Sequence, residues 1–168
     1  MEWNPPRPID PHDDLTGFTS DEPSLDRYLV ERALANHLAG FARCYVCTTV
    51  DHGVESLVGY YTLSAIAIER SLLPGHLRRN SPDPVPAILL GRLGVHTKVQ
   101  NTGLGRFLVR DAILSTLAAA GHVGVRILLV HALNERVAQF YTTLDFVPSP
   151  TDSMHLYLSL ADAQASLN

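Results

Sequence analysis

The stretch Val99-Gln100-Asn101-Thr102-Gly103-Leu104-Gly105-Arg106 is a polar, glycine-spaced turn between an apolar segment and a long helical pattern. Before it, residues 87–95 are apolar and follow Pro86, which predicts a buried strand. After it, apolar residues recur at steps of three and four and predict a helix from Leu104 to about Gly121. The stretch therefore predicts a strand, a glycine-rich turn and a helix, in that order.

A turn of this kind can bind an anion. The free backbone N–H groups and the partial positive charge at a helix start attract phosphate. Gly103 and Gly105 carry no Cβ, so a phosphate can approach the backbone, and Arg106 adds a cation. The dinucleotide fingerprint G-x-G-x-x-G fails because Leu108 replaces its third glycine, and no P-loop Gly-Lys-Ser or Gly-Lys-Thr follows. From spacing alone, a phosphate site and an ordinary tight turn both stay open.

Length and composition bound the class of protein. With 168 residues, 46% of them hydrophobic, we expect one domain over residues 1–168, with irregular tails at 1–14 and 161–168. The first residues lack the features of a signal peptide, and no apolar run reaches the roughly 20 residues that span a bilayer. We therefore expect a cytoplasmic protein with reduced thiols.

Cys44 and Cys47 form a C-x-x-C spacing within a predicted strand. Residues three apart on a strand point to opposite faces, so the two thiols could not share a metal ion. Two packed cysteines are therefore favoured over a zinc or redox site, and we predict no metal site.

The net charge of −4 hides a basic stretch. Between Arg70 and Arg110, seven cations face the single acid Asp83, which gives this stretch a net charge of +6. Such a stretch is compatible with contacts to phosphate or RNA, and an ordinary solvated face explains it equally well.

The remaining pattern predicts an α+β (mixed α/β) fold, in which helices flank one central mixed sheet. Its antiparallel half precedes a parallel pair of strands joined by a crossover helix. The expected elements are a short strand at 15–18, a helix from Pro23 to about His37 that Gly40 ends, strands at 43–50 and 56–68 joined by a hairpin turn, a loop at 70–86 with a helical turn at 72–77, a strand at 125–132, a helix over 134–144 and a strand at 154–160.

A wider pattern gives the turn a chemical purpose. Gln100 to Gly105 reads Q-x-x-G-x-G after an apolar strand, and a later helix carries Asn134, Phe140 and Tyr141. This combination resembles the GNAT superfamily of acetyl-CoA-dependent N-acetyltransferases over roughly residues 87–146. Residues 24–29, 58–64 and 90–95 extend the resemblance to the toxin branch of this superfamily, from bacterial type II toxin-antitoxin pairs.

The resemblance implies acetyl-CoA as the coenzyme. The turn would hold its pyrophosphate, and the backbone of the preceding strand would bind the pantetheine arm as an added strand. Asn134 is either a coenzyme contact or only a helix N-cap. Tyr141 is the candidate catalytic acid for the departing thiolate, and simple packing beside Phe140 is the alternative. The implied coenzyme-binding residues are Leu93, Gly94, Val95, Gln100, Asn101, Thr102, Gly103, Leu104, Gly105, Arg106 and Asn134.

The resemblance also implies a substrate and partners. These are the amino group of aminoacyl-tRNA, a ribbon-helix-helix antitoxin and a second copy of the chain in a homodimer. Arg78, Arg79 and Arg92 are candidate contacts to the RNA backbone. A GNAT enzyme that acetylates a small amine or a protein N-terminus, and a non-catalytic binding module with this fold, stay open as alternatives.

Two residues depart from the pattern of the toxin branch. His96 stands where aspartate is usual, and Asp145-Phe146 replaces the usual Gly-Phe. The first leaves open a contact beside the turn, and the second leaves open how the helix that carries Tyr141 ends.

Overall fold

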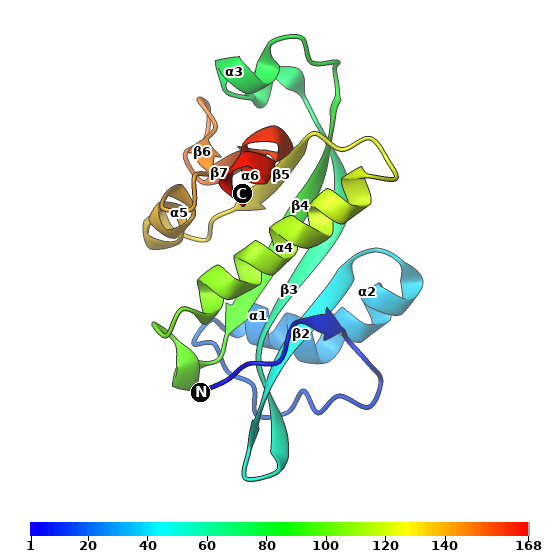
Figure 1. Cartoon of the computed structure of the whole chain (residues 1–168), viewed down its shortest axis with the longest axis vertical. Helices are drawn as coiled ribbons and strands as arrows, with labels where there is room; N and C mark the ends of the chain where they lie inside the picture. The colour runs from blue at the N-terminus through cyan, green and yellow to red at the C-terminus, as the bar shows by residue number, and fades with distance from the viewer. Residues whose placement is uncertain (168) are drawn as a thin grey trace. The chain divides into compact units, whose positions relative to one another are not determined.

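A computed structural model describes residues 1–167 (Figure 1). Within them, seven strands form one mixed sheet in the order β1-β2-β3-β4-β5-β7-β6. Strands β4 and β5 are parallel, whereas the pairs β1–β2, β2–β3, β5–β7 and β6–β7 are antiparallel. This mixed sheet confirms the predicted mixed α/β fold. The strands are β1 Arg7–Pro8, β2 Arg43–Asp51, β3 Val54–Ile68, β4 Val85–Val95, β5 Ile127–His131, β6 Val147–Pro148 and β7 His155–Ser159.

The chain divides into two compact units, and β3, β4 and helix α4 (Leu104–Ala120) contribute residues to both. Unit 1 comprises residues 1–64 and 91–112, and unit 2 comprises residues 65–90 and 113–168.

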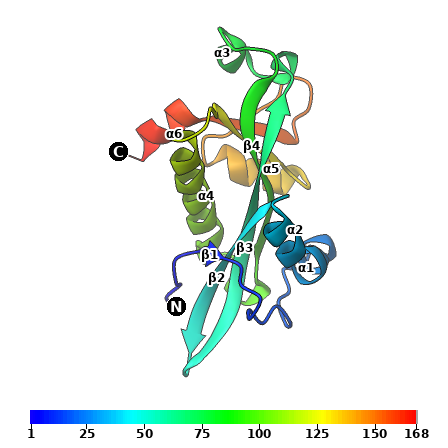
Figure 2. The same cartoon turned by 90° about the vertical axis from the view of Figure 1, so that its right-hand side faces the viewer.

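Unit 1 contains the predicted hairpin of β2 and β3, with Asp51 opposite Val54 (Figure 2). The two residues of its turn, His52 and Gly53, have φ angles of 49° and 79°. Positive φ at both central residues is the geometry whose twist matches that of the flanking strands, so it closes the hairpin without splaying them. The hairpin is confirmed, with boundaries within two residues of those predicted.

The predicted helix that starts at Pro23 is also confirmed. It consists of α1 (Pro23–Tyr28), a π-helical segment (Leu29–Ala33) and α2 (Leu34–Ala39), and it ends at Gly40, whose φ is 83°. Its apolar face packs on one face of β2 and β3 in a cluster of buried side chains. The cluster comprises Ile9, Phe18, Tyr28, Leu29, Ala33, Cys44, Val46, Leu57 and Tyr60.

Both cysteines are free and buried in β2, as the packing interpretation predicted. Burial raises the pKa of the Cys44 thiol to about 12 and that of the Cys47 thiol to about 11. Both side chains are therefore uncharged thiols at neutral pH.

Unit 2 is built around β5, which lies between β4 and the antiparallel β7. The predicted loop at 70–86 is more structured than expected, because it contains a 3₁₀ turn (Arg70–Leu72) and α3 (Gly75–Arg78). Leu73 and Leu77 bury this loop against the core of the unit. The core comprises Ile68, Leu73, Leu77, Val85, Ala87, Ile127, Leu129 and Tyr157.

Three expectations for the ends and edges were wrong. Residues 15–18 form no strand, and β1 at Arg7–Pro8 pairs with β2 instead, within an otherwise irregular segment 1–14. The predicted irregular tail at 161–168 is helical over α6 (Leu160–Ser166), because the Ser159 side chain caps this helix by accepting the Asp162 N–H at 3.0 Å. Asn168 lies outside the described residues.

Helix α4 begins at Leu104 and ends at Ala120, one residue before Gly121, so its predicted bounds are confirmed. Among the helices of residues 1–167, none is both long enough and apolar enough to cross a membrane.

Candidate functional site

The predicted coenzyme turn lies in unit 1 between β4 and α4, and its backbone is tightly bent. A short 3₁₀ helix at Thr97–Val99 is followed by Asn101 and Gly103 with φ angles of 62° and 97°. Asparagine tolerates the left-handed region better than most residues, and glycine enters it without strain. A Cβ at position 103 would meet no other atom within 4 Å. The φ of 97°, which residues with a side chain rarely adopt, is therefore the reason why glycine suits this position.

Gln100, the first residue of the Q-x-x-G-x-G pattern, holds this turn to its surroundings. Its side-chain amide donates to the Ser20 carbonyl at 2.9 Å and to the Val95 carbonyl at 3.1 Å. Both side-chain N–H groups therefore have partners in the protein. The Gln100 side chain fixes the turn, which leaves anion binding to backbone groups.

His96, which stands where aspartate is usual in the toxin branch, caps the short 3₁₀ helix before the turn. Its Nδ1 accepts the Lys98 N–H at 3.1 Å and so caps the 3₁₀ helix, as a carboxylate oxygen would. Its Nε2 lies 3.2 Å from the Gly17 carbonyl. Since Nδ1 is the acceptor, we assign the proton to Nε2, which donates to Gly17. His96 thus caps the 3₁₀ helix and links it to Gly17.

The start of α4 has the backbone geometry that the predicted anion site requires. The first helical hydrogen bond runs from the Phe107 N–H to the Gly103 carbonyl at 3.1 Å. The N–H groups of Leu104 and Gly105 precede it and have no acceptor within the helix. These amides and the positive end of the helix dipole form a backbone cradle of the kind that binds phosphate. The turn therefore has the backbone groups that a phosphate site requires.

Close packing against two glycines fixes the start of α4 and the end of β4. A Cβ on Gly59 of β3 would lie 2.9 Å from Leu108 Cδ1 and 3.4 Å from Leu104 Cδ2. A Cβ on Gly94 of β4 would lie 2.8 Å from Cε1 of the Tyr60 ring, whose hydroxyl is bonded to the Leu25 carbonyl. Gly59 therefore faces α4 and the neighbouring Tyr60 faces α1, so these helices cover opposite faces of the sheet in this unit.

The predicted strand contacts, Leu93, Gly94 and Val95, form the last three residues of β4. The backbone beyond them is held by the His96 N–H, which donates to the Val58 carbonyl at 2.8 Å. The Val95 carbonyl already accepts from Gln100. These bonds fix the strand end and the turn that follows as one piece of backbone.

Tyr141 lies in unit 2 on α5 (Glu135–Thr142), and its side chain is 5% exposed. Its ring meets Phe140 and Phe146 edge to face, with centroid distances of 5.1 Å and 5.3 Å. Burial raises the pKa of its phenol above the ordinary value of 10. The phenol therefore keeps its proton at neutral pH, as a proton donor must.

Both ends of α5 are fixed by specific residues. Asn134 caps the start, because its Oδ1 accepts the Val137 N–H at 3.0 Å. A contact of Asn134 with the coenzyme stays a prediction. At the other end, Asp145 has a φ of 71°, and the Phe146 N–H donates to the Tyr141 carbonyl at 3.2 Å. Asp145 thus adopts the left-handed conformation for which glycine is usual, and the helix still ends in a hydrogen-bonded turn.

The three predicted RNA contacts lie on different elements. In unit 2, Arg78 ends α3 and Arg79 follows it, and both are exposed. In unit 1, the exposed Arg92 lies on β4, and its guanidinium carbon lies 3.8 Å from the centroid of the Tyr28 ring. This cation–π contact fixes the Arg92 side chain, whereas Arg78 and Arg79 extend from a surface loop.

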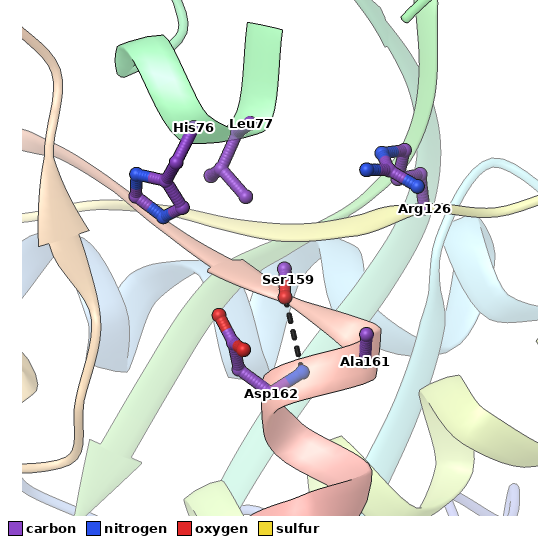
Figure 3. Close-up of a pocket in the computed structure, with 6 residues that line it drawn as sticks. All are labelled: His76, Leu77, Arg126, Ser159, Ala161 and Asp162. Atoms are coloured by element: carbon purple, nitrogen blue, oxygen red, sulfur yellow. Dashed lines mark hydrogen bonds between the residues drawn. The ribbon is translucent and has the colours of Figure 1, made fainter. Parts of the chain in front are cut away.

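Unit 2 also contains a small hollow of about 200 Å³ (Figure 3). Its lining includes the imidazole of His76, the guanidinium of Arg126 and the carboxylate of Asp162. Because a negative group lines it beside the basic ones, the hollow lacks the uniformly positive charge expected of a phosphate site. None of the predicted site residues lines it. The lining residues are His76, Leu77, Arg126, Ser159, Ala161 and Asp162.

Comparisons with known proteins agree with this geometry. The chain is 50% identical over 163 residues to a tRNA-acetylating toxin of Mycobacterium tuberculosis (strain ATCC 25618 / H37Rv), which covers 97% of this chain and 96% of that toxin. No protein-family model matches the chain.

Three solved structures resemble the whole chain. A tyrosine-to-phenylalanine mutant of KacT superimposes with a TM-score of 0.90 at 29% identity, covering 99% of both chains. AtaT complexed with acetyl-methionyl-tRNAfMet also gives a TM-score of 0.90, at 26% identity, covering 99% of this chain and 100% of AtaT. AtaTR bound with AcCoA gives a TM-score of 0.84 at 26% identity, covering 99% of this chain and 98% of that one.

The mixed sheet, the turn that opens α4 and these neighbours define a GNAT-fold, acetyl-CoA-dependent N-acetyltransferase. Within this class, the identity of 50% over nearly the full length shows that the chain belongs to the family of tRNA-acetylating toxins. The resemblance stated from the sequence motifs is thereby confirmed.

Proposed function

We propose that this protein transfers the acetyl group of acetyl-CoA to the amino group of aminoacyl-tRNA and so blocks translation as the toxin of a type II toxin-antitoxin pair. The observation that carries the proposal is the near-full-length similarity to a tRNA-acetylating toxin. The solved complex of AtaT with acetyl-methionyl-tRNAfMet supports the same acceptor chemistry. Residues 1–168 act as one domain, in the cytoplasm where charged tRNA occurs.

Acetyl-CoA binds along the end of β4 and at the turn that follows. The N–H groups at the start of α4 bind the pyrophosphate, and Arg106 adds positive charge beside them. Backbone groups of Leu93, Gly94 and Val95 bind the pantetheine arm and the acetyl carbonyl. Gln100 and His96 act indirectly, since their side chains hold the turn in shape.

The acceptor amine needs little activation. An α-amino group has a pKa of roughly 7.7–8.0, so a substantial fraction is neutral near pH 7, and an adjacent ester lowers the pKa further. The nitrogen lone pair attacks the thioester carbonyl, and the tetrahedral intermediate then expels the thiolate of coenzyme A. The nitrogen loses its extra proton to solvent, so a strong general base is not required.

Tyr141 supplies the proton that the departing sulfur takes up. Burial raises the pKa of its phenol, which keeps the hydroxyl protonated until the C–S bond breaks. The phenol donates its proton to the thiolate, and solvent returns a proton to the tyrosine after the products leave. Asn134 contributes through the cap that fixes the start of α5.

Arg78, Arg79 and Arg92 bind the phosphate backbone of the RNA, which positions the tRNA without reading its sequence. A ribbon-helix-helix antitoxin neutralises the protein, and the active form is a homodimer. A solved structure of AtaT bound to the C-terminus of the antitoxin AtaR is an example of a toxin of this fold with an antitoxin partner.

Induced expression combined with acetyl transfer tests the proposal. We expect induction to arrest growth and labelled acetyl-CoA to modify charged but not deacylated tRNA. Acetylation of small amines or protein N-termini without growth arrest would identify a different GNAT enzyme. Binding without turnover of acetyl-CoA would identify a non-catalytic module.

A further inference from the structure

The segment Glu2–Asn4 of unit 1, called the strap here, is bonded along β2. The Thr49 hydroxyl donates to the Glu2 carbonyl at 2.7 Å, and the Asn4 N–H donates to the Thr48 carbonyl at 2.8 Å. The Asn4 amide also donates to the Thr48 hydroxyl at 3.0 Å, and the Cys47 thiol donates to the Asn4 carbonyl at 3.3 Å. These bonds on both sides of Trp3 fix the direction of its side chain.

The Trp3 ring packs on Phe107 in the first turns of α4. The ring centroids lie 5.7 Å apart at an interplanar angle of 41°. Trp3 Nε1 is the one fully buried side-chain nitrogen or oxygen without a hydrogen-bond partner among the described residues. An unpaired buried N–H costs free energy, so hydrogen bonding does not account for the position of this ring. Contact with Phe107 does account for it.

Phe107 links the strap to the coenzyme turn. Its N–H makes the first hydrogen bond of α4, to the carbonyl of Gly103, whose φ of 97° defines the bend. Displacement of the Phe107 ring would therefore move the residue that closes the turn. The ends of a helix are prone to fraying. Here the Trp3 side chain, 104 positions earlier in the sequence than Phe107, packs on the start of α4.

We propose that Trp3 is a positioning residue for coenzyme A: the strap presses Trp3 against Phe107 and so holds the pyrophosphate turn in its binding conformation. This inference rests on the proposed function, because it assigns the turn to coenzyme A. Trp3 itself touches neither coenzyme nor acceptor in this scheme. It acts on the affinity for acetyl-CoA and leaves the chemical step unchanged.

The test uses the full chain with Trp3→Ala and Trp3→Phe, and Phe41→Ala as a control at an aromatic side chain that is 75% exposed. Titration calorimetry with coenzyme A gives the Kd, and initial rates give KM and kcat. An aromatic pair is worth roughly 0.5–1.5 kcal/mol, so we expect Trp3→Ala to raise Kd and KM about fivefold with kcat unchanged. Trp3→Phe keeps a ring without the unpaired N–H, so it should bind coenzyme A as the unchanged protein does.

Thermal unfolding of each variant separates positioning from a general loss of stability. A Trp3→Ala protein that binds coenzyme A with unchanged Kd would overturn the inference, whether or not its melting temperature is lower. So would equal losses of affinity in Trp3→Ala and Trp3→Phe. If Trp3→Ala does not fold, Trp3→Leu replaces it, with the same direction expected. Failure of the unchanged protein to bind coenzyme A would instead overturn the proposed function, and this inference with it.

Discussion

In the turn at residues 96–103, polar side chains form hydrogen bonds with backbone groups, whereas on α5 the ring of Tyr141 packs against two other aromatic rings. His96 and Gln100 use their side chains to hold the turn. Tyr141 is held by Phe140 and Phe146 through ring contacts. The turn thus offers backbone N–H groups to a ligand, and α5 offers a side chain. Substitutions in the two regions should therefore change different kinetic constants.

The largest effect is expected for Tyr141→Phe. Loss of a general acid lowers rates by roughly 10²–10⁴-fold, so kcat should fall by that factor. The KM for acetyl-CoA and the melting temperature should stay unchanged, because the ring contacts with Phe140 and Phe146 remain. Steady-state kinetics and calorimetry measure both. An unchanged kcat would remove Tyr141 from the mechanism.

The pH profile should show the amine and not the tyrosine. The rate should rise through about pH 7–8 as the acceptor amine loses its proton. The active form of Tyr141 is protonated, and burial raises its pKa, so the phenol keeps its proton up to at least about pH 10. The rate should therefore stay level between about pH 8.5 and 9.5. A fall in this window that disappears in Tyr141→Phe would show that the phenol has an ordinary or lowered pKa.

In the turn, Gln100→Glu should weaken coenzyme binding. The substitution keeps the shape but replaces both N–H donors with a carboxylate that faces the Ser20 and Val95 carbonyls. Loss of two hydrogen bonds worth about 1 kcal/mol each predicts a KM for acetyl-CoA raised at least about tenfold, with kcat unchanged. Gln100→Ala serves as the control, because it removes the donors without adding charge, and it should have the smaller effect. A Gln100→Glu protein with normal KM would show that these bonds do not support the turn.

Arg78 and Arg79 are exposed cations on a surface loop, and their proposed contact is with the phosphate backbone of the RNA. Replacement of both by alanine should raise the KM for tRNA several-fold. It should also reduce the slope of a plot of the logarithm of tRNA affinity against the logarithm of salt concentration. The KM for acetyl-CoA should not change. A matched pair of substitutions at Arg32 and Arg136, two exposed arginines on helices, controls for the loss of charge alone. Equal effects of the two pairs would argue against a specific RNA contact.

The smallest effect is expected for Asp145→Gly. Asp145 has a φ of 71°, which glycine adopts more readily, so the substitution should stabilise the protein by about 1 kcal/mol. The melting temperature should rise by about 2–4 °C without a change in kcat. Asp145→Ala keeps the Cβ and should give no stabilisation. A less stable Asp145→Gly protein would mean that the carboxylate itself supports the end of α5.

Short-range signals in the sequence predicted most of the fold. The hairpin follows from Asp51-His52-Gly53 between β-rich segments, and the long helices follow from apolar periodicity. Helix α6 could also have been predicted, since Ser159 and Asp162 form a capping pattern before an alanine-rich segment. Strand β1 could not, because two residues with a proline carry no strand signal of their own.

In the candidate site too, local motifs predicted some features, and contacts between distant residues were not predicted. Gly103, Gln100 and Tyr141 were identified from their motifs, but the sequence did not reveal that Gln100 bonds backbone carbonyls. The cap by His96 depends on the start of a three-residue 3₁₀ helix, which no periodicity predicts. The contact of Trp3 with Phe107 joins positions that are distant in sequence, so no local pattern could indicate it.

Mass spectrometry of the reaction product tests the central claim most directly. Charged tRNA is incubated with acetyl-CoA and the protein and digested with a nuclease, and the aminoacyl-adenosine is analysed. We expect one acetyl group on the amino group of the aminoacyl residue, formed by the unchanged protein and nearly absent with Tyr141→Phe. Unmodified aminoacyl-adenosine from the reaction with the unchanged protein would contradict it.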